Sequence, residues 1–345
     1  MSSKNNKPKL SVLFSNPNFI SPFKEHFKAN FDLFWNKLPF TPPPNHWTNL
    51  LSIASFPFRL VYKKMRTLSS SRNSDIIFVE FADQTLAFAS KWRKSKMIVT
   101  RLHRYELFNL PKADWSAVDL VIVVNEWMGK NLELAVPSLK GKIVCIHNFV
   151  DLNFWTRPSV KERTNILSIV GTIYKRKGHD KAILAFSKVL KKKNDLILNI
   201  IGNSPDKKFY DDLKSLVKDI GIEDNVNFMG YASDLKLEFQ KSDIILSFSE
   251  HESTHLTLFE GLSCGALPLS RNWEGVKEFL PSSNIFTDDS DFVDKVLSFY
   301  SKEQSESIKI VDELANVTLP LFSSPDPREM MSKTILEKYL DFKKK

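Results

Sequence analysis

Residues 243–270 read DIILSFSEHESTHLTLFEGLSCGALPLS, and this segment indicates the architecture of the chain. It begins with an apolar run of strand length, DIILSFS, which predicts a buried strand. A helix is predicted to begin near Thr254 or His255 and to run through LTLFEGLSCG, where glycine ends it. A second apolar run, ALPLS, follows. Because a helix joins the two strands, they are expected to lie parallel in one sheet.

The same alternation of apolar runs and amphipathic, helix-length segments continues along the chain. Before residue 150 the apolar runs are LSVLF, FDLFW, DIIFVEF, KMIVTRLH, LVIVVN and KIVCIHN, and after it they are NILSIVG, LILNIIG, NVNFMG, DIILSFS, ALPLS and NIFTD. Such strands are typical of parallel sheets buried on both faces. Two series predict an α/β protein of two doubly wound domains. Proline and charge interrupt the pattern at residues 151–165, so we expect the domains to span residues 1–152 and 153–326.

Composition limits the class of protein. The chain has 345 residues, of which 42% are hydrophobic and 26% charged, enough for two globular domains. No apolar run approaches the roughly 18 residues that a membrane span needs, and the polar start MSSKNNKPKL does not resemble a signal peptide. Cys145 and Cys264 have no spacing typical of a disulfide framework or a zinc site. We therefore expect a cytoplasmic protein.

The net charge of +9 is unevenly distributed. Residues 1–150 hold 21 Lys and Arg against 10 Asp and Glu, whereas the remainder holds 28 against 30. A basic first half is expected to face an anionic partner, which is a membrane surface, an anionic glycan or a nucleic acid. The same charge also suits a domain whose lysine-rich faces only keep it soluble. Both interpretations stay open at this point.

The segment 36–66, NKLPFTPPPNHWTNLLSIASFPFRLVYKKMR, departs from the alternation. Its second half is apolar with a basic end, a pattern found in helices that lie on membranes. Pro57 is expected to interrupt that helix. We therefore expect a pair of helices that covers the core, with membrane association as the alternative.

Residues 251–255, HESTH, match HExxH, the signature of zinc proteases. In those enzymes both histidines lie one turn apart on a single helix. Here the predicted strand end and helix start fall inside the motif, so the two histidines are not expected to share a helix face. We therefore predict no zinc site and no essential metal.

Several loops at strand ends carry groups that suit a phosphate ligand. In an open parallel sheet, ligands bind beyond the carboxyl ends of the strands. After NILSIVG the chain continues with Lys175, Arg176 and Lys177, and then with Gly178, which opens a helix. Three cations beside a helix N-terminus suit a pyrophosphate. After LILNIIG and NVNFMG come the turns NSP and YASD, where a ligand can approach the backbone.

Glu252 and Glu260 lie eight positions apart within the segment 243–270. The amides of residues 255–257, at the start of the predicted helix, are unpaired donors suited to phosphate or sugar oxygens. Glu260 lies about one turn into the helix, where a carboxylate can accept both hydroxyls of a ribose. Glu252, in the preceding turn, can reach a sugar. This spacing is therefore interpreted as part of a nucleotide-sugar site.

The sequence resembles retaining glycosyltransferase family 4, which has the two-domain GT-B architecture. That family's signature is a strand, E-x7-E, a helix with a small-residue turn, and another strand, and Glu252, Glu260 and GLSCGALPL match it in order. IVGTIYKRKGHDKAILAF resembles the family's G-R-L-x-x-x-K-G segment, LNIIGNSP its I-G-x-G-P turn, and NVNFMGYASD its F-x-G-Y segment. HNFVDLNFW resembles its link between domains, N-G-V-D-x-x-x-F. The resemblance extends along most of the chain.

This resemblance implies two Rossmann-like domains that face each other across a cleft, with a C-terminal helix, about residues 327–345, that crosses back to the first domain. It implies a UDP- or GDP-sugar donor, no required cofactor, and transfer of a hexose-type sugar with retention. The acceptor is expected to be a glycan, a lipid-linked molecule or a cell-surface polysaccharide. His103, which ends KMIVTRLH and adjoins Arg104 and Glu106, matches the family's histidine that faces the donor sugar.

The residues expected to act form two groups. The predicted catalytic residues are His103, Lys177 and Glu252. The residues predicted to bind the donor are Gly171, Thr172, Lys175, Arg176, Lys177, Gly202, Asn203, Tyr231, Ala232, Glu252, His255, Leu256, Thr257 and Glu260.

Four positions depart from the family's motifs. Thr172 stands where the family has Arg, Ser204 and Phe149 where it has Gly in the turn and in the link, and His255 where it has Gly after the first Glu. The glycine-rich loop near the N-terminus is replaced by SNPNFISPF. The absent Arg weakens the family's phosphate clamp, and Lys175 or Arg176 is the expected replacement.

Three alternative functions stay open. A nucleotide-sugar epimerase shares the fold, although the basic first half argues against it. A glycosyltransferase that modifies nucleic acid would use the basic surface to hold its acceptor. A GT-B protein that binds a nucleotide sugar without catalysis would keep the donor site alone.

Overall fold

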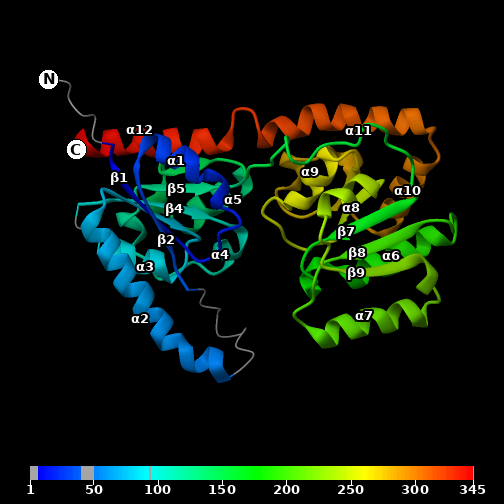
Figure 1. Ribbon diagram of the computed structural model, residues 1–345, viewed down its shortest axis with the longest axis horizontal. Helices are drawn as coiled ribbons and strands as arrows, with labels where there is room; N and C mark the ends of the chain where they lie inside the picture. The colour runs from blue at the N-terminus through cyan, green and yellow to red at the C-terminus, as the bar shows by residue number, and fades with distance from the viewer. Residues whose placement is uncertain (1–6, 40–49, 93–94, 345) are drawn as a thin grey trace. The chain divides into compact units, whose positions relative to one another are not determined.

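A computed structural model describes residues 7–39, 50–92 and 95–344 (Figure 1). The chain forms two compact domains. The first consists of Met1–Phe149 together with Pro325–Lys345, and the second of Val150–Ser324. The boundaries at residues 149 and 324 lie slightly before the positions predicted from the sequence, 152 and 326.

In the described residues of the first domain, parallel strands form a sheet in the order β2-β1-β3-β4-β5-β6. The strands are β1 (Lys9–Phe14), β2 (Asp32–Lys37), β3 (Ile76–Glu80), β4 (Met97–Leu102), β5 (Leu120–Val123) and β6 (Ile143–Cys145). The helices between them are α1 (Lys24–Asn30), α2 (Leu50–Asn73), α3 (Gln84–Lys91), α4 (Arg104–Phe108) and α5 (Glu126–Ala135). Every residue of β3 and β4 is buried, because helices cover both faces of the sheet.

The second domain has the same architecture, with parallel strands in the order β12-β11-β10-β7-β8-β9. The strands are β7 (Ile166–Val170), β8 (Ile197–Ile201), β9 (Val226–Gly230), β10 (Ile244–Ser247), β11 (Leu267–Arg271) and β12 (Ile285–Phe286). The helices are α6 (His179–Leu190), α7 (Lys207–Asp219), α8 (Leu235–Lys241), α9 (Leu256–Ser263), α10 (Asp289–Tyr300) and α11 (Gln304–Thr318). Leu167 and Ile169 of β7 belong to one hydrophobic cluster and Val170 to another, so a core lies on each face.

The prediction of two doubly wound α/β domains is confirmed by these strand orders. In the second domain the order reverses between β7 and β10, because the chain adds β8 and β9 on one side and later adds β11 and β12 on the other. At such a switch point the loops after the two central strands separate and leave a crevice for a ligand. The loops after β7 and β10, together with the first turns of the helix that follows β10, contain most of the residues predicted to bind the donor.

Helix α12 (Pro327–Lys344) belongs to the first domain although it follows the second domain in sequence. Met331, Ile335 and Tyr339 lie in the hydrophobic cluster of the first sheet. Ser332 Oγ donates to the carbonyl of His26 at 2.9 Å and accepts from Asn30 Nδ2 at 2.8 Å, which fixes α12 beside α1. In Figure 1, α12 is the red helix next to α1.

Helix α2 differs from the sequence-based expectation. It runs continuously from Leu50 to Asn73 with Pro57 inside it, so the prediction that Pro57 interrupts the helix is wrong. A proline inside a helix removes one backbone hydrogen bond and crowds the carbonyl four residues earlier, and the packing of α2 against α3, β1 and β3 offsets that cost. Residues 40–49, where a preceding helix was expected, lie outside the described residues. No helix in the described part of the chain is long and apolar enough to cross a membrane.

Substitution of Ile335 tests whether α12 completes the first core. Ile335 is fully buried, whereas Leu340 on the same helix is 52% exposed. Ile335→Ala should lower the free energy of unfolding by about 2–5 kcal/mol, because it removes buried methylene groups and leaves a cavity. The matched control Leu340→Ala should change it by about 0.5 kcal/mol or less. Urea denaturation measures both, and equal effects would contradict the assignment of α12 to the core.

Candidate functional site

The loops after β7, β8 and β10 approach each other closely at the carboxyl edge of the second sheet. A Cβ atom on Gly202 would lie 2.0 Å from the carbonyl oxygen of Gly171, and a Cβ atom on Gly178 would lie 2.4 Å from that of Phe248. The φ angles of Gly202 and Gly178 are 145° and 68°, which only glycine adopts readily. A side chain at either position would force these loops apart.

Lys177, Arg176 and Glu252 join the loops after β7 and β10. Lys177 Nζ donates to Glu252 Oε1 at 2.5 Å, and Arg176 Nη1 lies 3.5 Å from the same oxygen. Arg176 Nη1 also donates to the carbonyl of His251 at 3.0 Å. A Cβ atom on Gly171 would lie 3.9 Å from Lys177 Nζ, so the ammonium group is close to the end of β7. The structure therefore brings these predicted site residues together at the switch point.

The charge of Glu252 is set by its neighbours. Its side chain is buried, and burial alone raises the pKa of a carboxyl group. Attraction by Lys177 and Arg176, to which His255 adds only in its protonated form at low pH, outweighs burial and lowers the pKa of Glu252 to about 2. Glu252 is therefore ionised at neutral pH. Because two cations face this one carboxylate, positive charge remains for an anionic ligand.

His255 is the N-cap of α9 and has a left-handed backbone, with φ of 55°. Its Nδ1 lies 2.6 Å from Ser247 Oγ, and its Nε2 is buried without a hydrogen-bond partner among the described residues. Burial and the charge of Lys177 lower the pKa of His255 to about 3, so the imidazole is neutral at neutral pH. The left-handed backbone gives a physical reason for the glycine that the resembling family has at this position.

The first turns of α9 contain a carboxyl group that no described residue binds. Leu256 and Thr257 open the helix, and Thr257 Oγ1 donates to the carbonyl of Val170 at 3.4 Å. Glu260 is half-buried, and burial raises its pKa to about 7. Within the described residues, no hydrogen bond or ion pair holds the Glu260 carboxyl group. A half-buried acceptor in this state suits a hydroxyl group of a ligand.

The remaining residues predicted to bind the donor lie in loops at the same edge of the sheet. Thr172, Lys175, Asn203 and Tyr231 are exposed, and Tyr231 is 79% exposed. Ala232 is half-buried against the hydrophobic cluster on one face of the sheet. Their side chains reach solvent, where a ligand can contact them.

His103 lies in the first domain, directly after β4, and its ring is buried. Its Nε2 lies 3.0 Å from Glu80 Oε1, which also accepts from Arg101 Nε at 3.1 Å. The ring of Phe81 stacks on the imidazole with 4.5 Å between the centroids. Burial lowers the pKa of His103, so the ring is neutral at neutral pH.

Glu80 and Arg101 were not predicted from the sequence, although a signal was present. Each is a charged residue inside an apolar strand, in DIIFVEF and KMIVTRLH, and buried charges need partners. Arg104 and Glu106, which follow His103 closely in sequence, have other contacts. Arg104 lies over the ring of Trp127 at 4.6 Å, and Glu106 accepts from the backbone amide of His103 at 2.9 Å.

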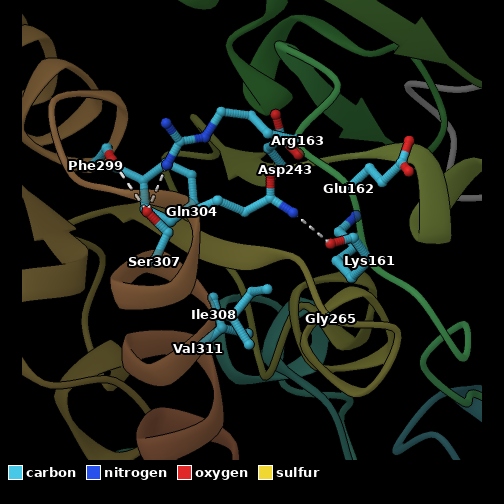
Figure 2. Close-up of a pocket in the computed structure, with 10 residues that line it drawn as sticks. All are labelled: Lys161, Glu162, Arg163, Asp243, Gly265, Phe299, Gln304, Ser307, Ile308 and Val311. Atoms are coloured by element: carbon cyan, nitrogen blue, oxygen red, sulfur yellow. Dashed lines mark hydrogen bonds between the residues drawn. The ribbon is translucent and has the colours of Figure 1, made fainter.

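A separate pocket lies at the amino ends of β7 and β10 and is shown in Figure 2. Its two cations already have partners. Lys161 Nζ donates to the carbonyls of Gln240 and Ser242 at 2.6 and 2.7 Å, and Arg163 Nη2 donates to Ser307 Oγ at 2.7 Å. These bonds attach the segment before β7 to the second domain, so we assign this pocket a structural role.

The two histidines of the HExxH match do not share a helix. His255 precedes α9, whereas His251 lies in the turn after β10 with its Nδ1 3.4 Å from Glu274 Oε2. Over residues 7–39, 50–92 and 95–344, no group of three or more His, Cys, Asp or Glu residues could hold a metal ion.

Three comparisons relate this site to known proteins. Residues 154–310 match the family model described as "Glycosyl transferases group 1". The chain is 25% identical to N-acetyl-alpha-D-glucosaminyl L-malate synthase of Bacillus anthracis over 63% of this chain and 61% of that protein. It is also 25% identical to the lipopolysaccharide glucosyltransferase WaaG of Escherichia coli, over 37% of this chain and 33% of that protein. The chain thus spans less than two thirds of the length of either relative.

A solved structure shares the fold. The crystal structure of Anabaena Alr3699/HepE in complex with UDP superimposes with a TM-score of 0.77 and covers 95% of this chain and 100% of that one. At 11% identity this likeness shows the fold alone, which is that of GT-B proteins. Residues 154–310, the greater part of the second domain, therefore belong to the glycosyl transferases group 1 family.

Proposed function

We propose that the protein is a retaining glycosyltransferase that moves a hexose-type sugar from a nucleoside-diphosphate sugar to a glycan, a lipid-linked molecule or a cell-surface polysaccharide. The observation that carries the proposal is the bond between Lys177 and Glu252 at the switch point, beside the start of α9. It places a cation that can hold a phosphate next to a carboxylate that can hold a sugar hydroxyl. The family of residues 154–310 supports the same activity.

Lys177 and Arg176 bind the diphosphate in this proposal. Both cations lie near Glu252, so an entering diphosphate exchanges part of their bonding to that carboxylate for bonds to its own oxygens. When the bond to the sugar breaks, negative charge increases on the departing diphosphate. Fixed cations and the first amides of α9 stabilise that charge without reorganising.

Glu260 binds the ribose. Its carboxyl group is half-buried and has no bonding partner among the described residues, and its raised pKa shows that burial disfavours the charge. Two ribose hydroxyls donating to the carboxylate offset that burial, and the pKa of Glu260 falls when the donor binds. The position of Glu260, one turn after the amides that meet the phosphates, follows the order of groups in a nucleoside diphosphate.

We propose that Glu252 contacts the transferred sugar, and the family resemblance assigns the same role to His103. Once the diphosphate takes over Lys177, the carboxylate of Glu252 is available to the sugar hydroxyls. His103 is neutral and is held by Glu80, so its ring can exchange hydrogen bonds with a hydroxyl without adding charge. We propose a same-face substitution through an oxocarbenium-like state. The bond between the anomeric carbon and the diphosphate oxygen breaks, the acceptor hydroxyl oxygen bonds that carbon on the same face, and the hydroxyl proton passes to the departing diphosphate.

The other predicted residues shape the donor site. Gly171, Thr172, Gly202 and Asn203 let the donor approach the backbone, and Lys175 adds charge at the rim. Tyr231 and Ala232 lie where the base is expected. His255 is neutral, so we propose that it shapes the site and influences donor choice rather than neutralising phosphate.

We propose a UDP-sugar as the donor, with a GDP-sugar as the alternative. Anabaena Alr3699/HepE, which shares the fold, has been solved with UDP and with UDP-glucose. We also propose a cytoplasmic location, because neither Cys145 nor Cys264 forms a disulfide within the described residues, as is usual in a reducing compartment.

A thermal-shift screen with UDP-, GDP-, ADP- and CDP-sugars tests the donor. UDP-glucose should raise Tm most, since a ligand at 100 times its Kd stabilises the folded state by about 2.7 kcal/mol. Analysis of the products then separates the alternatives. Glycosylated acceptor supports the proposal, an isomerised nucleotide sugar identifies an epimerase, and binding without turnover identifies a binding protein.

Substitution of Lys177 tests the stabilisation of the leaving group. Lys177→Gln keeps a donor toward Glu252 but removes the charge, so kcat should fall by about 10²- to 10³-fold. The control is Lys188→Gln, an exposed lysine of α6 that pairs with Asp289 at 2.8 Å, and it should leave kcat unchanged. Steady-state kinetics with the donor identified above provide the comparison. Equal rates for the two variants would contradict the role of Lys177.

The pH dependence of donor binding tests Glu260. Its pKa of about 7 in the free protein means that the carboxyl group is mostly protonated below that pH. Only the ionised form accepts two hydroxyls, so UDP-glucose should bind about tenfold more weakly at pH 6 than at pH 8. Glu260→Gln should weaken binding and remove the pH dependence. Isothermal titration calorimetry measures both, and an unchanged pH profile in the variant would rule out the assignment.

A further inference from the structure

One face of α2 presents a continuous apolar stripe to solvent. Phe58, Val61, Tyr62 and Met65 are 79%, 55%, 46% and 65% exposed. Their spacing of three, four and seven positions places them on one side of the helix. Single exposed apolar residues are ordinary, but a continuous stripe marks a surface that contacts another apolar phase. In Figure 1 the first half of α2 extends beyond the strands of its own domain.

The opposite face of α2 is polar and buried, the reverse of a helix that covers a core. Lys63 is 1% exposed, and its Nζ donates to Asp83 Oδ2 at 2.8 Å. Thr67 and Ser70 are also buried, and Thr67 Oγ1 donates to the carbonyl of Lys63 at 2.8 Å. Helix α2 is thus attached to its domain in large part through polar bonds, and the four residues of the stripe stay exposed while its other described Phe and Leu side chains are half-buried. Core formation does not explain the stripe.

The charges of α2 are all of one sign. The helix contains Arg59, Lys63, Lys64, Arg66 and Arg72 and no acidic residue. At 100° per residue, Arg59 and Arg66 flank the stripe on one side and Lys64 on the other, and Arg72 continues it. An apolar stripe with cations along its edges is the arrangement of a helix that lies in the interface of an anionic bilayer, where long side chains extend to the head groups.

We propose that the exposed face of α2 binds the surface of an anionic lipid bilayer. The charge pattern favours this partner over a second copy of the chain, because a two-fold contact of α2 with itself would bring like charges together with no acid on the helix to neutralise them. It also favours lipid over nucleic acid, since the centre of the stripe holds Val61 and Met65, which offer nothing to phosphate. The proposal goes beyond the transfer reaction and does not depend on it.

Sedimentation with vesicles tests the proposal on the full chain without any measurement of activity. The protein should sediment with vesicles of phosphatidylcholine and phosphatidylglycerol but not with phosphatidylcholine alone. Added salt should weaken the binding, because the cations lie at an exposed surface. A failure here leaves the glycosyltransferase proposal intact, and an inactive donor site leaves this one intact.

Two pairs of variants separate the apolar from the ionic contribution. Phe58→Ser with Met65→Ser should lower the partition coefficient of the protein between the vesicles and the solution about tenfold or more. Lys64→Gln with Arg66→Gln should lower it about thirtyfold, since each basic side chain near an anionic surface contributes about fivefold. All four side chains are exposed, and the contacts of Arg66 with Asn36 Oδ1 and of Lys64 with the ring of Trp92 lie at the surface, so Tm should change little.

Matched controls lie elsewhere on the chain. Leu134→Ser changes a leucine of α5 that is 80% exposed, and Lys207→Gln with Lys208→Gln removes two exposed charges from α7. Neither should alter vesicle binding. Equal binding to both vesicle types, or equal losses in the controls, would overturn the proposal. If the protein is a dimer and Phe58→Ser with Met65→Ser makes it monomeric, the stripe contacts a second copy of the chain. If a DNA duplex competes with the vesicles for binding, the stripe contacts nucleic acid. Either result would overturn the proposal.

Discussion

Both sheets are covered on both faces, and this burial decides where charge can lie. A charged side chain inside such a sheet loses its hydration unless a partner replaces it. The charges of the candidate site accordingly lie where strands end. Lys177 and Glu252 meet beyond β7 and β10, and Glu80 and Arg101 pair near the ends of β3 and β4. The position of the candidate site therefore follows from the position of the two cores.

Close backbone contacts set the geometry of that site. The loop after β8 touches the loop after β7 at Gly202, and the start of α6 touches the end of β10 at Gly178. These contacts fix the distance between strand ends, and with it the position of the cations on one loop relative to the carboxylate on another. His255 adopts a backbone conformation that favours glycine, and its bond to Ser247 Oγ compensates for part of that cost.

Local sequence patterns predicted many of the strands and helices, whereas contacts between residues distant in sequence were not predicted. Apolar runs predicted the strands because both faces of the central strands are buried, whereas the edge strands β2 and β9 are partly exposed. The spacing of Glu252 and Glu260 was informative because one strand, turn and helix hold both. The partners of Glu252 and His103 were not predictable, since Lys177 and Glu80 come from other strands. Periodicity shows that Phe58 and Met65 share a face of α2, but it does not show whether that face is buried.

The first domain draws part of its core from residues that follow the second domain, and this has a consequence for synthesis. Residues 150–324 leave the ribosome before α12, which supplies Met331, Ile335 and Tyr339 to the first core. Domains generally fold as units during synthesis. The second domain can therefore become compact first, while the earlier half keeps part of its apolar sheet uncovered. The first domain is complete only after α12 has been made. Chaperone contact and premature termination therefore affect the first domain rather than the candidate site of the second domain.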